Sequence, residues 1–414
     1  MKQKNPNSRF KEFETPWEVK TLQEISQKVI EKNCDSSITE VFTNSAEFGV
    51  MSQLDFFSHS IANKKNIDGY YIVRPDDFVY NPRMSVTAPV GPINRNALKR
   101  TGIMSPLYYV FRTHDVDVQF LEHFFKTRIW HKFMWSNGDN GARGDRFSIK
   151  DDVFQQMPIS FPSTPEEQYK IAQFFSRLDT LIAAEDKKLA KLKNMKAASL
   201  EKMFPKAGET TPQVRFKGFK GEWVYKALKE IASNFEYGIN APAKSFDGIN
   251  KYLRITDIDD DLRTFDKTNL TSPDAQDIQS FLLQEGDIVF ARTGASVGKS
   301  YLYDTKDGVV VYAGYLIKAR LDESVCHRFI LYATLSARFS NFIRITSQRS
   351  GQPGVNSKEY GEYMFQIPPT KEEQIIIADF FSRLDTLISA QEQKLDKLRS
   401  LKKSFLEKMF VSTK

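Results

Sequence analysis

The feature that most constrains this chain is an internal repeat. Residues 164–204 return as residues 370–410 without a gap, and roughly three in five positions are identical. The same offset of 206 places Trp17 on Trp223. Between these segments the two halves diverge. The chain is therefore expected to fold as two related globular domains, each followed by one helical segment.

The repeated segments have the pattern of long helices. Thr164 with Glu167, and Thr370 with Glu373, have the spacing of capping boxes, in which the hydroxyl and the carboxylate each satisfy a free backbone N–H. Beyond them, apolar residues recur three and four positions apart, which is typical of a coiled-coil seam. The residues expected to pair the helices or to bind a partner are Phe175, Leu178, Ile182, Leu189, Leu192, Phe381, Leu384, Ile388, Leu395 and Leu398.

Two nearly identical seams in one chain most economically pack on each other, and an antiparallel pairing suits helices with a whole domain between them in sequence. A generic dimerisation helix is the alternative. The expected fold class is α+β, with two pseudo-repeated mixed α/β domains separated by two long antiparallel coiled-coil helices. The expected boundaries are 1–160 and 215–366 for the domains, 161–204 and 367–414 for the helical spacers, and 205–214 for a linker.

Composition limits the function without defining it. The 414 residues include 59 basic and 52 acidic side chains, a net charge of +7, which favours a polyanionic partner. The two cysteines lie far apart, and no Cys or His group has metal-ligand spacing, so neither a disulfide framework nor a metal site is indicated. The start lacks an apolar signal core and no apolar run could span a membrane, so we expect a soluble, cytoplasmic protein.

The stretch RTGASVGKS, residues 292–300, looks like the phosphate-binding loop of an ATPase. Such a loop needs four residues between its first glycine and the Gly-Lys-Ser, with a helix after it. Here three residues intervene, and residues 300–321 have the pattern of a strand, a turn and a strand. The sequence therefore predicts a loop between strands rather than a nucleotide site.

Catalytic interpretations find little support. An amino-methyltransferase needs an Asn/Asp-Pro-Pro-aromatic motif to hold a flipped base, and NPRM, Asn81 to Met84, lacks the second proline and the aromatic residue. The five histidines form no recognisable order of nucleophile, base and orienter. Adjacent acids such as Asp76 and Asp77 face opposite ways on a strand, which suits turns better than a nuclease metal site. We expect no catalytic residue and no metal in this chain.

The motifs combine into a pattern that resembles a known family. An opening RF-x2-F-x3-W-x4-L-x2-I precedes GDIVFARTGASVGK at 286–299, GQPGVN at 351–356 and PPTKEEQIIIADFFSRLDTLI at 368–388, and the plan occurs twice. Across essentially the whole chain this order resembles the specificity subunit of type I restriction-modification systems. The loops of the first domain match the family pattern only loosely.

The resemblance implies two target-recognition domains, each recognising one half of a split double-stranded DNA target. It implies that the helices bind two modification subunits, which carry S-adenosylmethionine and methylate adenine. Restriction subunits that translocate and cut DNA would join them, with ATP and Mg²⁺ in the partner subunits. On this basis the chain itself needs no cofactor and catalyses nothing. A stand-alone DNA-binding protein, or a helix-mediated adaptor without a methylase, is the alternative.

The candidate DNA contacts lie in loops whose chemistry changes between the halves. Residues 75–85 occupy the place of 285–296, and residues 141–148 that of 351–358. Arginine, lysine, glutamine and asparagine are side chains that bond phosphates or base edges. The candidates are Arg83, Arg143, Arg146, Arg292, Thr293, Ser296, Lys299, Gln352, Asn356 and Lys358.

Overall fold

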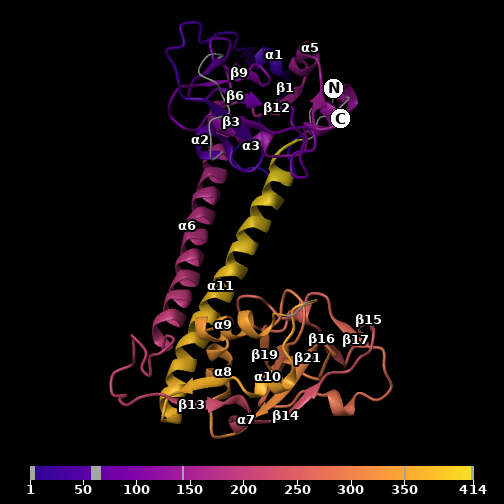
Figure 1. Ribbon diagram of the computed structural model, residues 1–414. Coiled ribbons are helices and arrows are strands. Elements are labelled where there is room, and N and C mark those ends of the chain that lie inside the picture. The colour runs from indigo at the N-terminus through magenta and orange to yellow at the C-terminus, as the bar shows by residue number, and fades with distance from the viewer. Residues whose placement is uncertain (1–4, 57–66, 142–143, 349–350, 412–414) are drawn as a thin grey trace. The chain divides into compact units, whose positions relative to one another are not determined.

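The chain divides into two compact units, each of which contains a globular domain and parts of both long helices. The first unit combines residues 1–185 with 394–414, and the second comprises residues 186–393. The computed structural model (Figure 1) describes residues 5–56, 67–141, 144–348 and 351–411.

The first domain is a mixed structure of short strands and helices that ends in one long helix. Its central sheet has the strand order β2-β9-β6-β7, and β1 pairs with β12 in a separate antiparallel ribbon. The elements are β1 Glu18–Thr21, α1 Leu22–Ile25, β2 Ser26–Lys28, β3 Phe42–Ser45, β4 Gly49–Ser52, α2 Gln53–Phe56, β5 Tyr71–Val73, β6 Phe78–Tyr80, β7 Ile93–Arg95, β8 Gly102–Met104, β9 Tyr109–Thr113, α3 Val118–Phe125, α4 His131–Asn137, β10 Asp139–Asn140, β11 Phe147–Ser148, α5 Asp151–Gln155, β12 Pro158–Phe161 and α6 Pro165–Met203.

The second domain repeats this plan. Its sheet has the order β14-β21-β18-β19, and β13 pairs with β22 as β1 does with β12. The elements are β13 Val224–Ala227, α7 Leu228–Ile231, β14 Ala232–Tyr237, β15 Ala243–Ser245, β16 Lys251–Leu253, η2 Ile255–Asp257, β17 Thr271–Pro273, η3 Gln279–Phe281, β18 Asp287–Ala291, β19 Ser300–Leu302, η4 Thr305–Asp307, β20 Val310–Tyr312, β21 Leu316–Leu321, α8 His327–Ala333, α9 Ala337–Thr346, α10 Ser357–Gly361, β22 Met364–Ile367 and α11 Lys371–Met409.

A buried aspartate anchors the same place in both sheets. Asp77, just before β6, is fully buried and accepts a bidentate pair of hydrogen bonds from Arg112 at 2.6 and 2.8 Å. Asp287, at the start of β18, is fully buried and accepts the same bond from Arg320 at 2.8 and 3.0 Å. A buried carboxylate is tolerated only when it is paired. These pairs therefore fix the register between the two central strands of each sheet.

Each long helix is tied to its domain by an ion pair at its start. Arg9 bonds Glu167 through two nitrogens at 2.7 Å, and Arg215 bonds Glu373 with the same geometry. The expected capping boxes are therefore wrong, because both carboxylates bind arginine instead of the backbone. Thr164 Oγ1 is buried and has no partner among the residues that the structure describes. Thr370 keeps only half of the motif, its hydroxyl accepting from the Glu373 N–H at 3.4 Å.

In the first unit, α6 and α11 run antiparallel. Early in α6, the Phe174 ring lies 5.0 Å from that of Phe405 near the end of α11. One and a half turns further along α6, Asp179 pairs with Lys402, and Glu185 then pairs with Lys394. Residue numbers rise on one helix as they fall on the other, which establishes the antiparallel direction.

The second unit contains the same helix pairing with the roles of the helices exchanged. Here α11 contributes its start, where Phe381 lies 6.1 Å from Phe204, and Lys196 Nζ lies 2.7 Å from Asp385. Lys196 and Asp385 occupy the repeat positions of Lys402 and Asp179. In this unit α8 packs on α11 (Figure 1), and the Tyr332 ring lies 5.1 Å from that of Phe381.

The expected seam faces inward over most of its length. Phe175 and the four α11 residues Phe381, Leu384, Ile388 and Leu395 are buried; Leu178, Ile182, Leu189, Leu192 and Leu398 are partly buried. Each unit thus consists of a mixed α/β domain and a segment of antiparallel helix pair, which confirms the α+β fold class. No helix in the described part of the chain is long and apolar enough to cross a membrane.

Candidate nucleic-acid interface

The loop that resembles an ATPase motif is a β-hairpin turn. Strand β18 is buried throughout, and residues 292–299 return the chain into β19, which pairs antiparallel with β18. No phosphate-binding helix follows, so the prediction of a loop between strands is confirmed. Gly298 has a φ of +87°, and a Cβ there would lie 2.7 Å from Ile343, so the turn requires glycine on both counts.

The structure brings the two candidate segments of the second domain together. Thr293 and Gly354 form an antiparallel bridge. The Gly294 N–H donates to Pro353 O at 3.0 Å, and the Val355 N–H donates to Arg292 O at 2.9 Å. We call this contact between residues 292–294 and 353–355 the second-domain loop bridge.

The first domain contains the same bridge between its two candidate segments. Arg83 and Arg146 form an antiparallel backbone bridge. The Met84 N–H donates to Asp145 O at 2.9 Å, and the Phe147 N–H donates to Pro82 O at 2.8 Å. This first-domain loop bridge, residues 82–84 with 145–147, matches the other bond for bond. Sequence reasoning paired these segments by position, but it gave no sign that they touch.

The first-domain loop bridge places two like charges opposite each other. Arg83 and Arg146 are exposed, and no ion pair of either is found in the described residues. Like charges directly across a strand pair are unfavourable unless an anion neutralises them. The two arginines therefore form a positively charged site that a polyanion such as DNA would neutralise. Arg143, the third candidate here, lies outside the described residues.

Arg292 is held on an aromatic ring in the second domain. It is half-buried, and its guanidinium carbon lies 4.9 Å from the centre of the Tyr237 ring. Tyr237 Oη lies 3.3 Å from Ser357 Oγ, and the Ser357 N–H donates to it at 3.4 Å. Hydrogen bonding with Ser357, followed by the charge of Arg292, lowers the pKa of the Tyr237 phenol. Sequence reasoning missed Tyr237 and Ser357, because no motif marks either residue.

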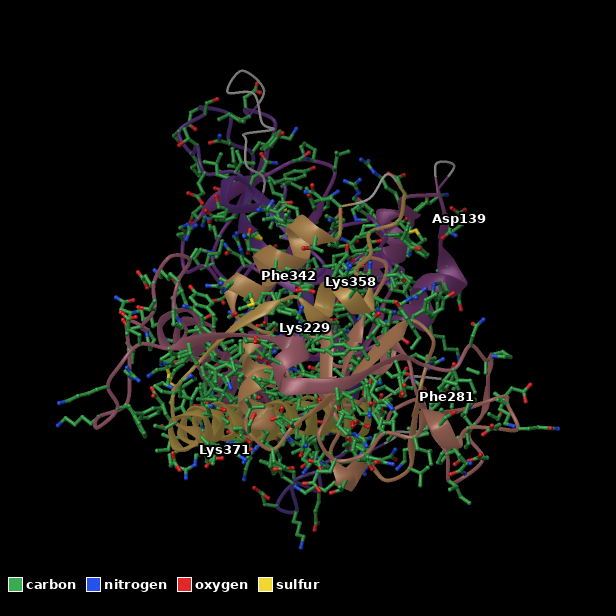
Figure 2. All side chains as sticks on the ribbon, turned by 60° about the horizontal axis from the view of Figure 1, so that its bottom comes forward. Asp139, Lys229, Phe281, Phe342, Lys358 and Lys371 are labelled. Atoms are coloured by element: carbon green, nitrogen blue, oxygen red, sulfur yellow. The ribbon has the colours of Figure 1, made fainter. Side chains whose placement is uncertain are left out.

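The remaining candidates of the second domain have varied surroundings. Thr293 and Ser296 are half-buried, and Gln352 is exposed with its Nε2 over Gly294. Asn356 is exposed, but its Oδ1 caps α10 by accepting the Glu359 N–H at 2.9 Å. Lys358 is exposed on α10, which packs beside α7 and its Lys229 (Figure 2).

Lys299 is the candidate whose placement disagrees with expectation. We expected its ammonium to be available to a phosphate. Only 7% of the residue is exposed, and its Nζ lies 2.6 Å from a carboxylate oxygen of Asp260. This ion pair lowers the pKa of the Asp260 carboxyl. In this structure Lys299 therefore joins the loop to residue 260 and does not present a free charge.

A separate pocket of about 940 Å³ lies in the second unit, and no candidate DNA contact lines it. Its charged groups are largely paired already. Lys267 lies 2.6 Å from Asp307, and Arg328 lies 2.9 Å from Asp379. Within the described residues, no group of three His, Cys, Asp or Glu side chains could hold a metal ion. The loop bridges are therefore the best-supported candidate site.

Curated relatives of this chain are specificity subunits of type I restriction enzymes. It is 25% identical over 318 residues to the type I restriction enzyme EcoKI specificity subunit of Escherichia coli strain K12, covering 70% of this chain and 64% of that subunit. It is 24% identical over 195 residues to the putative type I restriction enzyme MjaX specificity subunit of Methanocaldococcus jannaschii, covering 46% of each. The matches thus span less than two thirds of each relative's length.

Solved structures share the fold. The S subunit of a type I restriction-modification system from M. genitalium superposes with a TM-score of 0.61 at 14% identity, covering 99% of this chain and all of that one. A chain from a study of complex assembly and conformational transition in the type I R-M system gives a TM-score of 0.56 at 15% identity, covering 96% and 99% of the two chains.

The sequence profile of the type I restriction modification DNA specificity domain matches the chain twice, at residues 14–194 and 220–400. Each match includes one globular domain and most of the helix that follows it. The two matches together cover well over half of the chain, and they coincide with the internal repeat and with the two equivalent loop bridges. The chain belongs to the type I restriction-modification DNA specificity family, and it contains two copies of that family's domain.

Proposed function

We propose that this chain is the DNA-recognition subunit of a type I restriction-modification complex, and that each domain recognises one half of a bipartite double-stranded DNA target. The observation that carries the proposal is the pair of loop bridges. Their backbone bonds are equivalent, while their side chains differ, with Pro82 in one domain where the other has Arg292. Two surfaces that recognise different DNA sequences need the same backbone support but different side chains, and the two bridges have both.

The DNA contacts would come from both bridges and their flanks. Arg83 and Arg146 in the first domain, and Gln352 and Lys358 in the second, are exposed and available to phosphates or base edges. Arg292, Thr293, Ser296 and Asn356 would contribute through the rim of the second bridge. Arg143, outside the described residues, stays a candidate of the first domain. Lys299 would act indirectly, by holding the hairpin turn through Asp260.

The helices would dock two modification subunits. Three apolar positions are exposed in both copies of the helix, at the repeat offset, although apolar side chains on a helix pair normally face inward. The pairs are Tyr169 with Ile375, Leu181 with Leu387, and Met195 with Leu401. Each unit carries one member of every pair. Two equal apolar surfaces suit two copies of one protein partner.

The chemistry would then belong to the partners. We propose that the modification subunits supply S-adenosylmethionine and that restriction subunits supply ATP and Mg²⁺, while this chain catalyses nothing itself. The cytoplasm is the proposed location, because the DNA target and the methyl donor are found there. A stand-alone DNA-binding protein or a helix-mediated adaptor without a methylase is the second candidate. The stand-alone protein gives no reason for apolar helix positions that are exposed in duplicate, and the methyl-transfer test below separates the adaptor.

The test is methyl transfer to DNA by this chain, by a modification subunit, and by the two together. Only the mixture should transfer methyl groups, and the mapped target should be bipartite. The double variant Leu181→Lys with Leu387→Lys should abolish assembly with the modification subunit while DNA binding by the chain persists. The matched control, Lys191→Gln with Lys397→Gln, changes two exposed residues of the same helices and should assemble normally. Methyl transfer by the chain alone, or normal assembly of the leucine variant, would refute the proposal.

A further inference from the structure

Arg292 is half-buried and has no carboxylate partner in the described residues, a feature that it shares there with Arg263 and Arg338, but of the three it alone lies in a loop bridge. No acid is paired with Arg292 in the part of the chain that the structure describes, and its Nε is buried without a hydrogen bond. Half-buried arginines that do bond carboxylates are Arg9, Arg95, Arg112, Arg215, Arg254 and Arg320. Burying a guanidinium part-way without an acid is unfavourable, so Arg292 has charge and donors left for a partner outside the chain.

The position of Arg292 is fixed from both its backbone and its side chain. Its N–H donates to Tyr315 O at 3.0 Å, and its carbonyl accepts the Val355 N–H at 2.9 Å. Its guanidinium lies on the Tyr237 ring, which Ser357 holds through its hydroxyl and its N–H. Stacking on an aromatic face leaves the edge of the guanidinium plane free. Nε is buried, and hydrogen bonding between the guanidinium and the Tyr237 phenol takes up part of the remaining capacity. The donors left for a ligand are therefore on the two terminal nitrogens.

Two groups on DNA could accept both of these donors at once, a phosphate and the major-groove edge of a guanine. Phosphate contacts fix the position of a protein on the duplex, and flexible exposed lysines or arginines supply them adequately. Guanine presents O6 and N7 in the major groove, and a bidentate bond to both needs a guanidinium held in one plane. A side chain immobilised before binding also loses less conformational entropy when it binds. The fixed, stacked geometry of Arg292 therefore favours guanine.

We propose that Arg292 recognises a guanine in the half of the target that the second domain contacts, with Tyr237 as its positioning residue. This inference rests on the proposed function and adds the identity of one base. The first domain has Pro82 at the equivalent bridge position, where no such bond can form. The guanine that Arg292 recognises therefore lies in the second half-site.

The test selects bound duplexes from a pool with randomised positions, using the chain assembled with its modification subunit. The unchanged chain should enrich a bipartite sequence with an invariant guanine in one half. Arg292→Gln and the charge-preserving Arg292→Lys should both relax that position roughly ten-fold or more and leave the other half-site intact. Tyr237→Leu should relax the same position less, and Tyr237→Phe, which keeps the ring, should largely restore it.

The matched control is Arg338→Gln. Arg338 also stacks on a tyrosine, with its guanidinium carbon 4.8 Å from the Tyr225 ring, but it bonds Gln366 at 3.0 Å and lies outside the loop bridge. It should leave the selected sequence unchanged. On the enriched duplex, replacing the guanine with 7-deazaguanine should weaken binding by the unchanged chain but not by Arg292→Gln.

Different failures have different meanings. If the unchanged chain enriches no sequence, the proposed function is wrong. If it enriches a bipartite sequence, but the Arg292 variants either keep every position or weaken all sequences equally, then Arg292 does not recognise a guanine. Equal weakening would identify a phosphate contact, and it would overturn the inference while leaving the proposed function standing.

Discussion

The two domains of this molecule agree where side chains are buried and differ where they meet solvent. Both have an arginine–glutamate pair at the start of the long helix, a buried aspartate–arginine pair in the sheet, and a lysine–aspartate pair between the helices. Both close their loops with the same backbone bridge, yet one bridge opposes Arg83 to Arg146 and the other opposes Thr293 to Gly354. Packing therefore constrains the shared buried pairs, whereas the exposed loop residues can change without disturbing them.

Some buried positions nevertheless differ between the two units. In the first unit the Trp17 indole donates to Glu167 at 3.2 Å, whereas the equivalent Trp223 Nε1 is buried without a partner in the described residues. His123 in the first unit packs against the Phe175 ring, and Tyr332 packs in the corresponding place against Phe381 in the second. Equivalent positions therefore differ in polarity, and the two units should respond differently to the same change.

The largest effect is expected at the helix starts. Glu167→Gln should destabilise the first unit by about 3 kcal/mol, because the Arg9 side chain, only 12% exposed, loses its countercharge, and because Trp17 loses a charged acceptor. Glu373→Gln should cost the second unit about 1 kcal/mol less, since Trp223 makes no such bond. Hydrogen exchange of peptides from residues 165–180 and 371–386 measures the two losses separately. An equal or larger loss for Glu373→Gln would break this contrast.

Acid should destabilise the first unit more than the second. Burial lowers the pKa of His123 to about 4, so the folded first unit favours the neutral imidazole. The stability this gives at neutral pH is lost as pH falls from about 6.5 towards 4, and the loss is about 2 kcal/mol at pH 5. In the second unit burial raises the pKa of Asp385, so that group destabilises less as pH falls. Hydrogen exchange at pH 7 and pH 5, corrected for intrinsic exchange rates, measures the change in stability of each unit separately.

The control for this prediction is His123→Phe, which keeps a ring against Phe175 and removes the titrating group. It should reduce the acid sensitivity of the first unit without changing that of the second. His131, whose pKa burial also lowers to about 4, should account for the remaining sensitivity of the first unit. Unchanged acid sensitivity in His123→Phe would exclude His123 as the cause.

The smallest effect concerns a groove that only one copy of the helix leaves open in the described structure. In the first unit the Phe405 ring packs on Phe174, 5.0 Å away. The repeat position in the second unit is Ser199, which lines a groove of about 340 Å³ together with Phe216 and Phe380. Ser199→Phe should fill this groove and stabilise the second unit by about 1 kcal/mol. Thermal unfolding with Ser199→Ala as the control checks it, and a destabilised phenylalanine variant would show that the groove is not equivalent.

Much of the fold could be predicted because it depends on patterns that repeat locally. The period of the apolar residues predicted both long helices, and the missing residue in RTGASVGKS predicted a hairpin turn in place of a nucleotide loop. The capping boxes were wrong because Glu167 and Glu373 have acceptable local partners but better distant ones in Arg9 and Arg215. Charge-assisted pairing with a buried arginine outweighs a single backbone cap.

The candidate site was predictable in its segments but not in its contacts. The order of motifs placed both loops of each domain, yet Lys299 looks like any loop lysine until Asp260 is found beside it. Tyr237 precedes Arg292 by 55 positions in sequence, and only the folded sheet brings its ring against the guanidinium. Long-range pairs of this kind have no local signal, so sequence reasoning could not identify them.

The central claim is that each domain recognises its half of the target independently, and an exchange of one domain tests it most directly. Residues 215–366 would be replaced by the second domain of another family member, and methylated positions would be mapped across a genome in cells that also carry the modification subunit. The account predicts that one half of the methylated sequence changes and the other half stays the same. Changes in both halves, with assembly intact, would contradict it.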